Sequence, residues 1–398
     1  MIHDYDTQYQ AEKQRLAKSD ISDKNKELIA KFEADLLLEG LSKPRLIRYM
    51  SIMRLVAKRL KKDFDKAKIP DLKRVVGAIQ SEKYSPHTKE VYKVMIRRFY
   101  KWLKGTKHYP EIVEWISIRM SRSEKKLPSE GDLLTEDDIE KLLNVANHPR
   151  DKALVAVLWE SGARMGEIGN LIFQNVKFDK HGVQITVQGK TGSRKIRLIS
   201  STPYLSTWMN AHPFRTDQKA PLWINIGTTN HNQPMRYENF RKMLKILFER
   251  AGIQKRSNPH LFRHSRATFM AHHLTEFQMN QYFGWIQGSD MPSTYVHMSG
   301  KEVEKAIMTM NGITLEDEKE ESKMQPQICP RCENINAHDS KHCSKCGGIL
   351  DLHLAVELSK QETVRGEADK LMNALFKDKD VQNLILEKIA SLDLRVNL

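Results

Sequence analysis

Two stretches decide the fold of this chain: HLFRH at residues 260–264 and GWIQGSDMPSTYVHMSG at residues 284–300. They are preceded by GARMGE at residues 162–167 and GKTGSRK at residues 189–195. Each stretch alone is typical of surface charge or of a satisfied core group. Together, and in this order, they bring arginines, a lysine, histidines and a tyrosine into one domain. Their order and spacing, rather than any one of them, carry the information about function.

The sequence around these stretches predicts a domain over residues 135–312. Thr135 and Asp138 resemble a capping box that starts its first helix. Alternating apolar residues on either side of a turn-rich segment at 189–193 predict a β-hairpin with Lys190 at its tip. Helical periodicity resumes from about residue 237 to residue 310. We therefore expect a mainly α domain with a small antiparallel β-sheet, an α+β arrangement.

An all-α domain is expected over residues 24–119, after an N-terminal tail at residues 1–23. Ile29, Phe32 and Leu36 recur at helical spacing, and the pattern repeats after Pro44. Ser85 looks like an N-cap, because a proline follows it in the first helical position. Residues 120–134 are polar, lack periodicity and predict a linker.

Positive charge is concentrated in this N-terminal part. Residues 24–126 hold 27 Lys and Arg against 12 Asp and Glu, a net of +15 that equals the net charge of the whole chain. A merely solvated surface is the alternative, but it does not explain such localisation, so nucleic acid is the favoured partner. The candidate DNA-contacting residues are Lys93, Arg97, Arg98 and Lys101 on the outer helix faces, and Arg194 and Lys195 on the hairpin.

The four cysteines of the chain follow an acidic linker at residues 313–327. They form the pattern C-x2-C-x10-C-x2-C within residues 328–350, and they are Cys329, Cys332, Cys343 and Cys346. Four thiolates suit tetrahedral Zn²⁺ and leave no open position, which predicts a structural zinc ribbon rather than a catalytic metal. His338 or His342 remains an alternative ligand. Residues 351–398 predict two amphipathic helices.

No stretch approaches the run of about 18 apolar residues that a membrane helix requires. The N-terminus also lacks the apolar core of a secretion signal. We therefore expect a cytoplasmic, nucleoid-associated protein without a membrane partner, and this location argues against disulfides among the cysteines.

The four stretches resemble the tyrosine recombinases, the integrase family that includes Xer proteins and phage integrases. The resemblance covers roughly residues 24–310 and implies a core-binding domain, a linker and a catalytic domain. It implies a site-specific DNA recombinase that cleaves and rejoins strands through a 3′-phosphotyrosyl intermediate, without a catalytic metal. Residue by residue, the family's catalytic positions fall on Arg164, Lys190, His260, Arg263, Trp285 and Tyr295, with Glu167 and His264 as supporting residues.

These assignments carry roles. Arg164 and Arg263 would neutralise charge on the nonbridging phosphate oxygens, which a guanidinium can do bidentately. Tyr295 would attack phosphorus, and His260 would exchange the proton of the tyrosine. Lys190 would protonate the departing 5′-oxygen.

The remaining residues have more than one interpretation. Glu167 is expected to brace Arg164 or His260. Trp285 either donates its indole N–H to the phosphate or only packs. His264 is expected to be a buried hydrogen-bonding histidine, and Tyr282, the competing tyrosine, a structural residue.

Three functions remain open at this point. The favoured one is a recombinase acting as a tetramer on paired sites, and the zinc-bearing extension makes it look like an archaeal type of integrase. A type IB topoisomerase-like nicking and rejoining enzyme would use the same active-site chemistry. A catalytically retired, zinc-containing DNA-binding regulator is the third, although every catalytic residue type is present.

Overall fold

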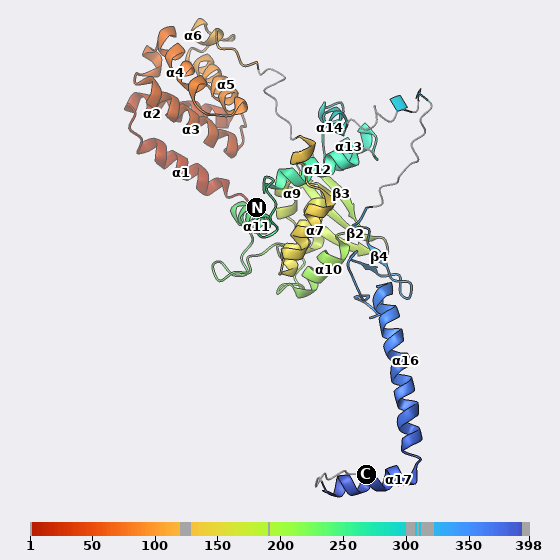
Figure 1. Ribbon diagram of the computed structural model, residues 1–398. Coiled ribbons are helices and arrows are strands. Elements are labelled where there is room, and N and C mark those ends of the chain that lie inside the picture. Colours follow the sequence, from red (N-terminus) through yellow and green to blue (C-terminus); the bar gives the residue numbers. More distant parts are fainter. Residues whose placement is uncertain are drawn as a thin grey trace. The chain divides into compact units, whose positions relative to one another are not determined.

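The computed structural model describes residues 2–119, 129–189, 192–271, 273–299, 307–308, 310–311 and 322–391. The chain divides into two compact units, residues 1–131 and residues 132–398 (Figure 1). Among the described helices, none is long and apolar enough to span a bilayer.

The first unit is entirely helical within its described residues, as expected. Its helices are α1 (Tyr5–Ala17), α2 (Asp23–Leu38), α3 (Lys43–Leu60), α4 (Ile69–Ser81), α5 (Pro86–Leu103) and the short α6 (Glu111–Glu114), with a 3₁₀ turn η1 (Phe64–Lys66). Ser85 caps α5 as predicted, because its side chain accepts a hydrogen bond from the backbone N–H of Thr88. One apolar core joins the helices, with Phe32 and Phe99 in edge-to-face contact at 5.1 Å between ring centroids.

The prediction of an N-terminal tail is wrong. Residues 5–17 form α1, which packs against α3 and buries Tyr9 and Leu16 in the core of the unit. Glu12 is buried as well, and its carboxylate accepts a hydrogen bond of 3.1 Å from Nε of Arg54 on α3. This ion pair ties α1 to α3, since the buried carboxylate of Glu12 depends on the partly exposed Arg54 for its partner.

Helices surround a small sheet in the second unit (Figure 1). These helices are α7 (Glu136–Val145), α8 (Pro149–Ser161), α9 (Met165–Gly169), α10 (Thr202–Ala211), α11 (Tyr237–Arg250), α12 (Pro259–Met270), α13 (Glu276–Phe283) and α14 (Met291–Ser299), with 3₁₀ turns η3 (Glu130–Asp132) and η4 (Phe173–Asn175). The central helix is α8, which is buried almost along its whole length and contacts α7, α10 and α12. The predicted capping box is present, because Thr135 and Asp138 exchange hydrogen bonds at the start of α7.

The sheet has three antiparallel strands in the order β1 (Val176–Asp179), β2 (Gly182–Gly189) and β3 (Gly192–Leu198). Strands β2 and β3 form the predicted hairpin, whereas β1 was not predicted. Lys190, expected at the tip, lies outside the described residues. Buried Glu160 of α8 joins the sheet to α10, because its carboxylate accepts backbone hydrogen bonds from Ile199 and Ser201 at 2.6 and 2.8 Å.

Both predicted linkers end earlier than expected. Residues 120–128 lie outside the described part, but Leu133 and Leu134 are buried in the second unit, and the N–H of Leu134 donates to Oγ of Ser265. Likewise, residues 312–321 are not described, whereas Ser322 and Lys323 bind the start of α7. The Ser322 hydroxyl donates to Glu136 at 2.6 Å, and Nζ of Lys323 lies 2.9 Å from the carboxylate of Asp137.

The cysteine-bearing segment is a small module with a two-stranded sheet, β4 (Gln327–Ile328) and β5 (Ile335–Asn336). Strand β5 contacts α10, so the module packs on a helix of the second unit. Two helices follow it, α16 (Leu352–Leu375) and α17 (Lys379–Ser391), as the sequence predicted. Their apolar side chains include Leu371 and Leu384, which are 63% and 60% exposed.

Candidate active site and cysteine cluster

The GARMGE stretch forms a sharp turn between two helices. Helix α8 ends at Gly162, whose φ of +53° lies in the left-handed region that glycine tolerates best. The turn places Arg164 at the N-cap of α9, and the carboxylate of Glu167 accepts a hydrogen bond from the Arg164 backbone N–H at 2.9 Å. The guanidinium of Arg164 also lies 3.1 Å from Oε1 of Glu167. Glu167 therefore braces Arg164, one of its two expected roles.

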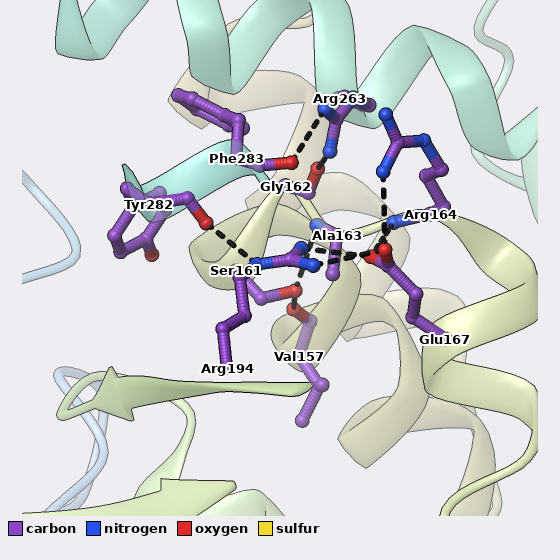
Figure 2. A network of polar contacts seen from close by, with 10 residues as sticks. All are labelled: Val157, Ser161, Gly162, Ala163, Arg164, Glu167, Arg194, Arg263, Tyr282 and Phe283. Carbon is purple, nitrogen blue, oxygen red and sulfur yellow. Dashed lines mark hydrogen bonds and ion pairs between the residues drawn. The ribbon is translucent and has the colours of Figure 1, made fainter. Parts of the chain in front are cut away.

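Arg194 of β3 also binds Glu167 (Figure 2). Its Nη1 and Nη2 donate to the two carboxylate oxygens at 2.9 and 2.8 Å, and its Nε donates to the carbonyl of Tyr282 at 2.8 Å. All three guanidinium nitrogens thus have partners inside the protein. This geometry contradicts the expected DNA contact of Arg194, whereas the neighbouring Lys195 is exposed as that role requires.

Glu167 is ionised in spite of its burial. Loss of water would raise the pKa of its carboxyl, but the hydrogen bonds and the charge of Arg194 lower it, followed by the backbone N–H and the charge of Arg164. The net result is a pKa below the usual value for glutamate. A carboxylate bound by two arginines is thereby fixed next to the candidate phosphate site.

Arg263 is held by two backbone carbonyls (Figure 2). Its Nη1 donates to the carbonyl of Gly162 at 3.1 Å, and its Nη2 donates to the carbonyl of Phe283 at 2.9 Å. Its charge lies 5.3 Å from the centroid of the Trp285 ring. Burial, followed by the charge of Arg164, lowers the pKa of Arg263 to about 10, so it stays protonated at neutral pH.

Tyr295 lies in an apolar cluster and is only 1% exposed. Its ring stacks on Trp285 with 5.4 Å between centroids and an interplanar angle of 4°. Its hydroxyl lies 2.8 Å from Nδ1 of His264. His264 thus makes the expected hydrogen bond but is half-buried rather than buried, and the contacts of Trp285 are those of a packing residue. Burial raises the pKa of Tyr295, although the charge of Arg263 opposes the rise.

His260 keeps part of its surface open to solvent. Partial loss of water around its ring lowers its pKa, and the charges of Arg263 and Arg164 lower it further. The two arginines are thus close enough to act on His260 electrostatically. Tyr282 is structural as expected: its hydroxyl donates to the carbonyl of Glu160 at 3.0 Å, and burial raises its pKa to about 12.

The predicted basic face of α5 is partly engaged in contacts within the first unit. The guanidinium of Arg97 stacks on the Tyr109 ring at 3.8 Å, and Lys101 lies 5.6 Å from the same ring. Arg98 binds Glu39. Lys93 on the same helix is half-buried.

A second basic surface was not predicted. Two adjoining hollows between α1, α2 and α3 share Lys58, and the cations around them are Arg15, Lys18, Arg54, Lys61, Lys62 and Lys66. This surface was missed because α1, which forms one wall of the first hollow, was not predicted as a helix.

The four cysteines converge, with all four Sγ atoms within 4.8 Å of one another. Cys329 and Cys346 are 3.6 Å apart, as are Cys332 and Cys343. Tetrahedral Zn²⁺ with Zn–S bonds of about 2.3 Å requires S···S separations near about 3.8 Å, so the donor set fits this ion. Neither His338 nor His342 belongs to a metal-binding group among the described residues.

The backbone builds two matching knuckles. The N–H of Glu333 donates to the carbonyl of Cys329, and the N–H of Gly347 donates to the carbonyl of Cys343, both at 2.9 Å. Glu333 and Gly347 each have a positive φ, +57° and +71°. The same turn therefore follows each C-x2-C pair and aims its sulfurs at a common centre.

A helical unit followed by a mixed domain with a two-arginine, one-tyrosine site defines the integrase class of fold. Residues 132–302 match the model of the phage integrase family. Tyrosine recombinase XerA of Pyrococcus furiosus is 24% identical over 287 residues, which cover 72% of this chain and 94% of that protein. XerD of Oceanobacillus iheyensis is 27% identical over 194 residues, 46% of this chain and 61% of that protein. Residues 132–302 thus carry a phage integrase family domain, and the chain is similar to tyrosine recombinases over most of its length.

Solved structures share the fold. The XerH recombinase bound to a palindromic difH substrate is 15% identical, with a TM-score of 0.55 over 76% of this chain and 95% of that one. A lambda integrase dimer bound to a COC′ core site is 14% identical, with a TM-score of 0.52 over 68% and 76%.

Proposed function

We propose that this chain is a site-specific DNA recombinase that cleaves and rejoins DNA strands through a 3′-phosphotyrosyl intermediate. The family of the chain and the names of its relatives support this activity over that of a nicking and rejoining topoisomerase. The retention of both arginines, the histidine and the tyrosine in one site argues against a retired regulator.

The reaction needs no net input of bond energy. The Tyr295 phenolic oxygen attacks the scissile phosphorus, a P–O bond to tyrosine forms, and the bond from phosphorus to the 5′-oxygen breaks. The phenolic proton leaves toward His260, and the 5′-oxygen takes up a proton, for which Lys190 is the candidate donor. Attack by the 5′-hydroxyl of a partner strand reverses these steps and rejoins the DNA.

One observation carries this proposal: backbone and carboxylate contacts hold Arg164 and Arg263 in place, and the charge of Arg263 acts on Tyr295. Their fixed charges can stabilise the negative charge that builds on the nonbridging oxygens. Preorganised guanidinium groups do so without reorganisation during the reaction, and they take the place that a metal ion has in other phosphoryl transfer enzymes.

We further propose a structural zinc ion held by Cys329, Cys332, Cys343 and Cys346. Its role would be to fold the ribbon that packs on α10. All four ligands come from the protein, which leaves no position for a substrate.

Double-stranded DNA is the proposed partner, bound through phosphate contacts by Lys195, by the cations of the first unit and by the active-site arginines. We propose a tetramer on paired sites as the recombining assembly. The place of action would be the nucleoid in the cytoplasm.

The test uses a pool of nicked DNA duplexes of random sequence. A nick close to the scissile phosphate lets the short cleaved fragment diffuse away, so the covalent complex accumulates. Selection of adducts on denaturing gels followed by sequencing gives the recognised site, and paired copies of that site then test recombination. Accumulation of adduct without recombinants, together with relaxation of supercoiled plasmid, would instead favour the topoisomerase-like reaction.

A further inference from the structure

Arg194 holds the carboxylate of Glu167 with the full fork of its guanidinium. The two N–H···O contacts, at 2.9 and 2.8 Å, occupy both oxygens in the bidentate geometry that only arginine offers (Figure 2). The Arg194 side chain is 11% exposed and that of Glu167 is 3% exposed. This pair is therefore an interior feature of the domain and is not part of its DNA-facing surface.

Arg164 makes fewer side-chain contacts with Glu167 than Arg194 does. A single nitrogen of its guanidinium, Nη1, contacts Oε1 at 3.1 Å, and its backbone N–H takes Oε2. The Arg164 side chain is 31% exposed, almost three times as much as Arg194. Glu167 thus orients Arg164 from one side, and it does not cover the guanidinium with a second parallel hydrogen bond.

We propose that Arg194 is a positioning residue for Arg164: by occupying both oxygens of Glu167, it keeps that carboxylate from pairing bidentately with Arg164. The remaining donors of Arg164 then stay available to the nonbridging oxygens of the scissile phosphate. This inference rests on the proposed function, because it assigns Arg194 a role in the same strand cleavage.

Removal of Arg194 would leave a buried carboxylate with one cation instead of two. Glu167 could then pair bidentately with Arg164, or take up a proton and stop orienting it. Space at the carboxylate is tight, since a Cβ placed on Gly189 would lie 2.5 Å from Oε1 of Glu167. Gly189 therefore limits movement of Glu167 on that side, and we expect the change to act on Arg164.

The third donor of Arg194, Nε, binds the backbone next to the carbonyl that holds Arg263. This nitrogen binds the carbonyl of Tyr282, and the next carbonyl along the chain, that of Phe283, accepts from Arg263. One side chain on β3 is thus connected to the supports of both phosphate-binding arginines.

The test compares two substrates that differ in charge at the scissile phosphorus. A methylphosphonate replaces one nonbridging oxygen with a methyl group and removes the negative charge that Arg164 would neutralise. Adduct formation is measured in the full chain for Arg194→Lys and Arg194→Met, with Arg164→Ala as the reference. Arg197→Met is the matched control, because Arg197 of the same strand pairs with exposed Asp179 at 2.7 Å to both oxygens.

We expect both Arg194 variants to lose at least about tenfold in the rate of adduct formation on the ordinary phosphate, as expected when an electrostatic donor is displaced. The loss should shrink to within about threefold on the methylphosphonate, in parallel with Arg164→Ala. Arg197→Met should match the unsubstituted chain on both substrates.

Equal losses on both substrates, or no loss on either, would overturn the inference, because the first indicates general misfolding and the second indicates no role. If the unsubstituted chain forms no adduct on either substrate, the proposed function itself fails. Normal adduct formation by the unsubstituted chain, with Arg194 variants that do not follow Arg164→Ala, overturns the inference alone.

Discussion

The Tyr295 hydroxyl lies 2.8 Å from Nδ1 of His264, one helical turn beyond His260, to which the family resemblance assigns proton exchange. Burial, followed by the charges of His260 and Arg263, lowers the pKa of His264, so the ring is neutral at pH 7 and can accept the phenolic hydrogen. Tyr295 is only 1% exposed, so we infer that it leaves this contact when it acts as the proposed nucleophile on a phosphate.

Removing the His264 acceptor should make it easier for the Tyr295 side chain to leave its buried position. In His264→Leu the buried hydroxyl loses a hydrogen bond worth about 1 kcal/mol, and we expect adduct formation to become about fivefold faster. His264→Asn can keep a polar atom near the Nδ1 position and should stay close to the unsubstituted rate. Single-turnover cleavage of a nicked substrate measures both. Slower cleavage in His264→Leu than in His264→Asn would mean that the contact serves the reaction itself.

The rate of strand cleavage should fall at a lower pH than it would if the base were a histidine with an ordinary pKa. Since partial burial, Arg263 and Arg164 lower the pKa of His260, its neutral form persists below the usual histidine value of about 6.5. A base that must be neutral then loses activity only as the pH falls through this lowered value. The rate of adduct formation from pH 5 to 8 checks this, and His260→Gln should remove the acid limb. A limb centred at or above pH 6.5 would contradict the assignment.

Two glycines of the same turn should respond in opposite ways to alanine. At Gly162, where φ is positive, the new Cβ would lie 2.8 Å from Cε1 of Phe283 and 3.0 Å from Cβ of Arg266. We expect Gly162→Ala to lower the free energy of unfolding by about 1 to 3 kcal/mol. Gly166 of α9 has no atom within 4 Å of the corresponding position, so Gly166→Ala should be neutral or slightly stabilising. Urea unfolding of both variants measures the difference, and similar losses would show that crowding at Gly162 is not the cause.

Loss of the zinc site should affect stability more than strand cleavage. Cys343→Ser removes one of four ligands, whereas Lys345→Ala changes an exposed residue within the same knuckle. We expect one zinc ion per chain in Lys345→Ala, little or none in Cys343→Ser, and a lower Tm only in the latter. Adduct yield below the Tm should be retained in both, because the described contacts of the ribbon reach α10 and not Arg164 or Arg263. Metal analysis and thermal unfolding measure the first two quantities. Absence of zinc from the unsubstituted chain would contradict the site.

Local signals explain why much of the fold could be predicted. The capping box of Thr135 and Asp138 and the cap at Ser85 act within four residues, so the sequence alone contains them. The cysteine pairs are equally local, since each C-x2-C turn closes its own hydrogen bond. The predicted convergence of all four sulfurs is confirmed by their distances.

Features that depend on distant partners were missed. Helix α1 is mostly polar, and its burial depends on α3, which supplies Arg54 for Glu12. Strand β1 buries only Val176, too little for an alternating pattern.

For Arg194 the signal was present but not used. It lies on the same strand face as buried Ile196 and Leu198, two and four residues further along β3, whereas Lys195 faces outward. This alternation predicts an inward arginine, and only the fold shows that its partner is Glu167.

The most direct test of the account is to identify the residue that carries the DNA. The full chain is incubated with the nicked substrate, the adduct is digested with trypsin and nuclease, and mass spectrometry locates the attached nucleotide. The account predicts a 3′-phosphate linkage to Tyr295, its loss in Tyr295→Phe and its persistence in Tyr282→Phe. Attachment at Tyr282, adduct retained in Tyr295→Phe, or cleavage that leaves no covalent protein–DNA bond would contradict it.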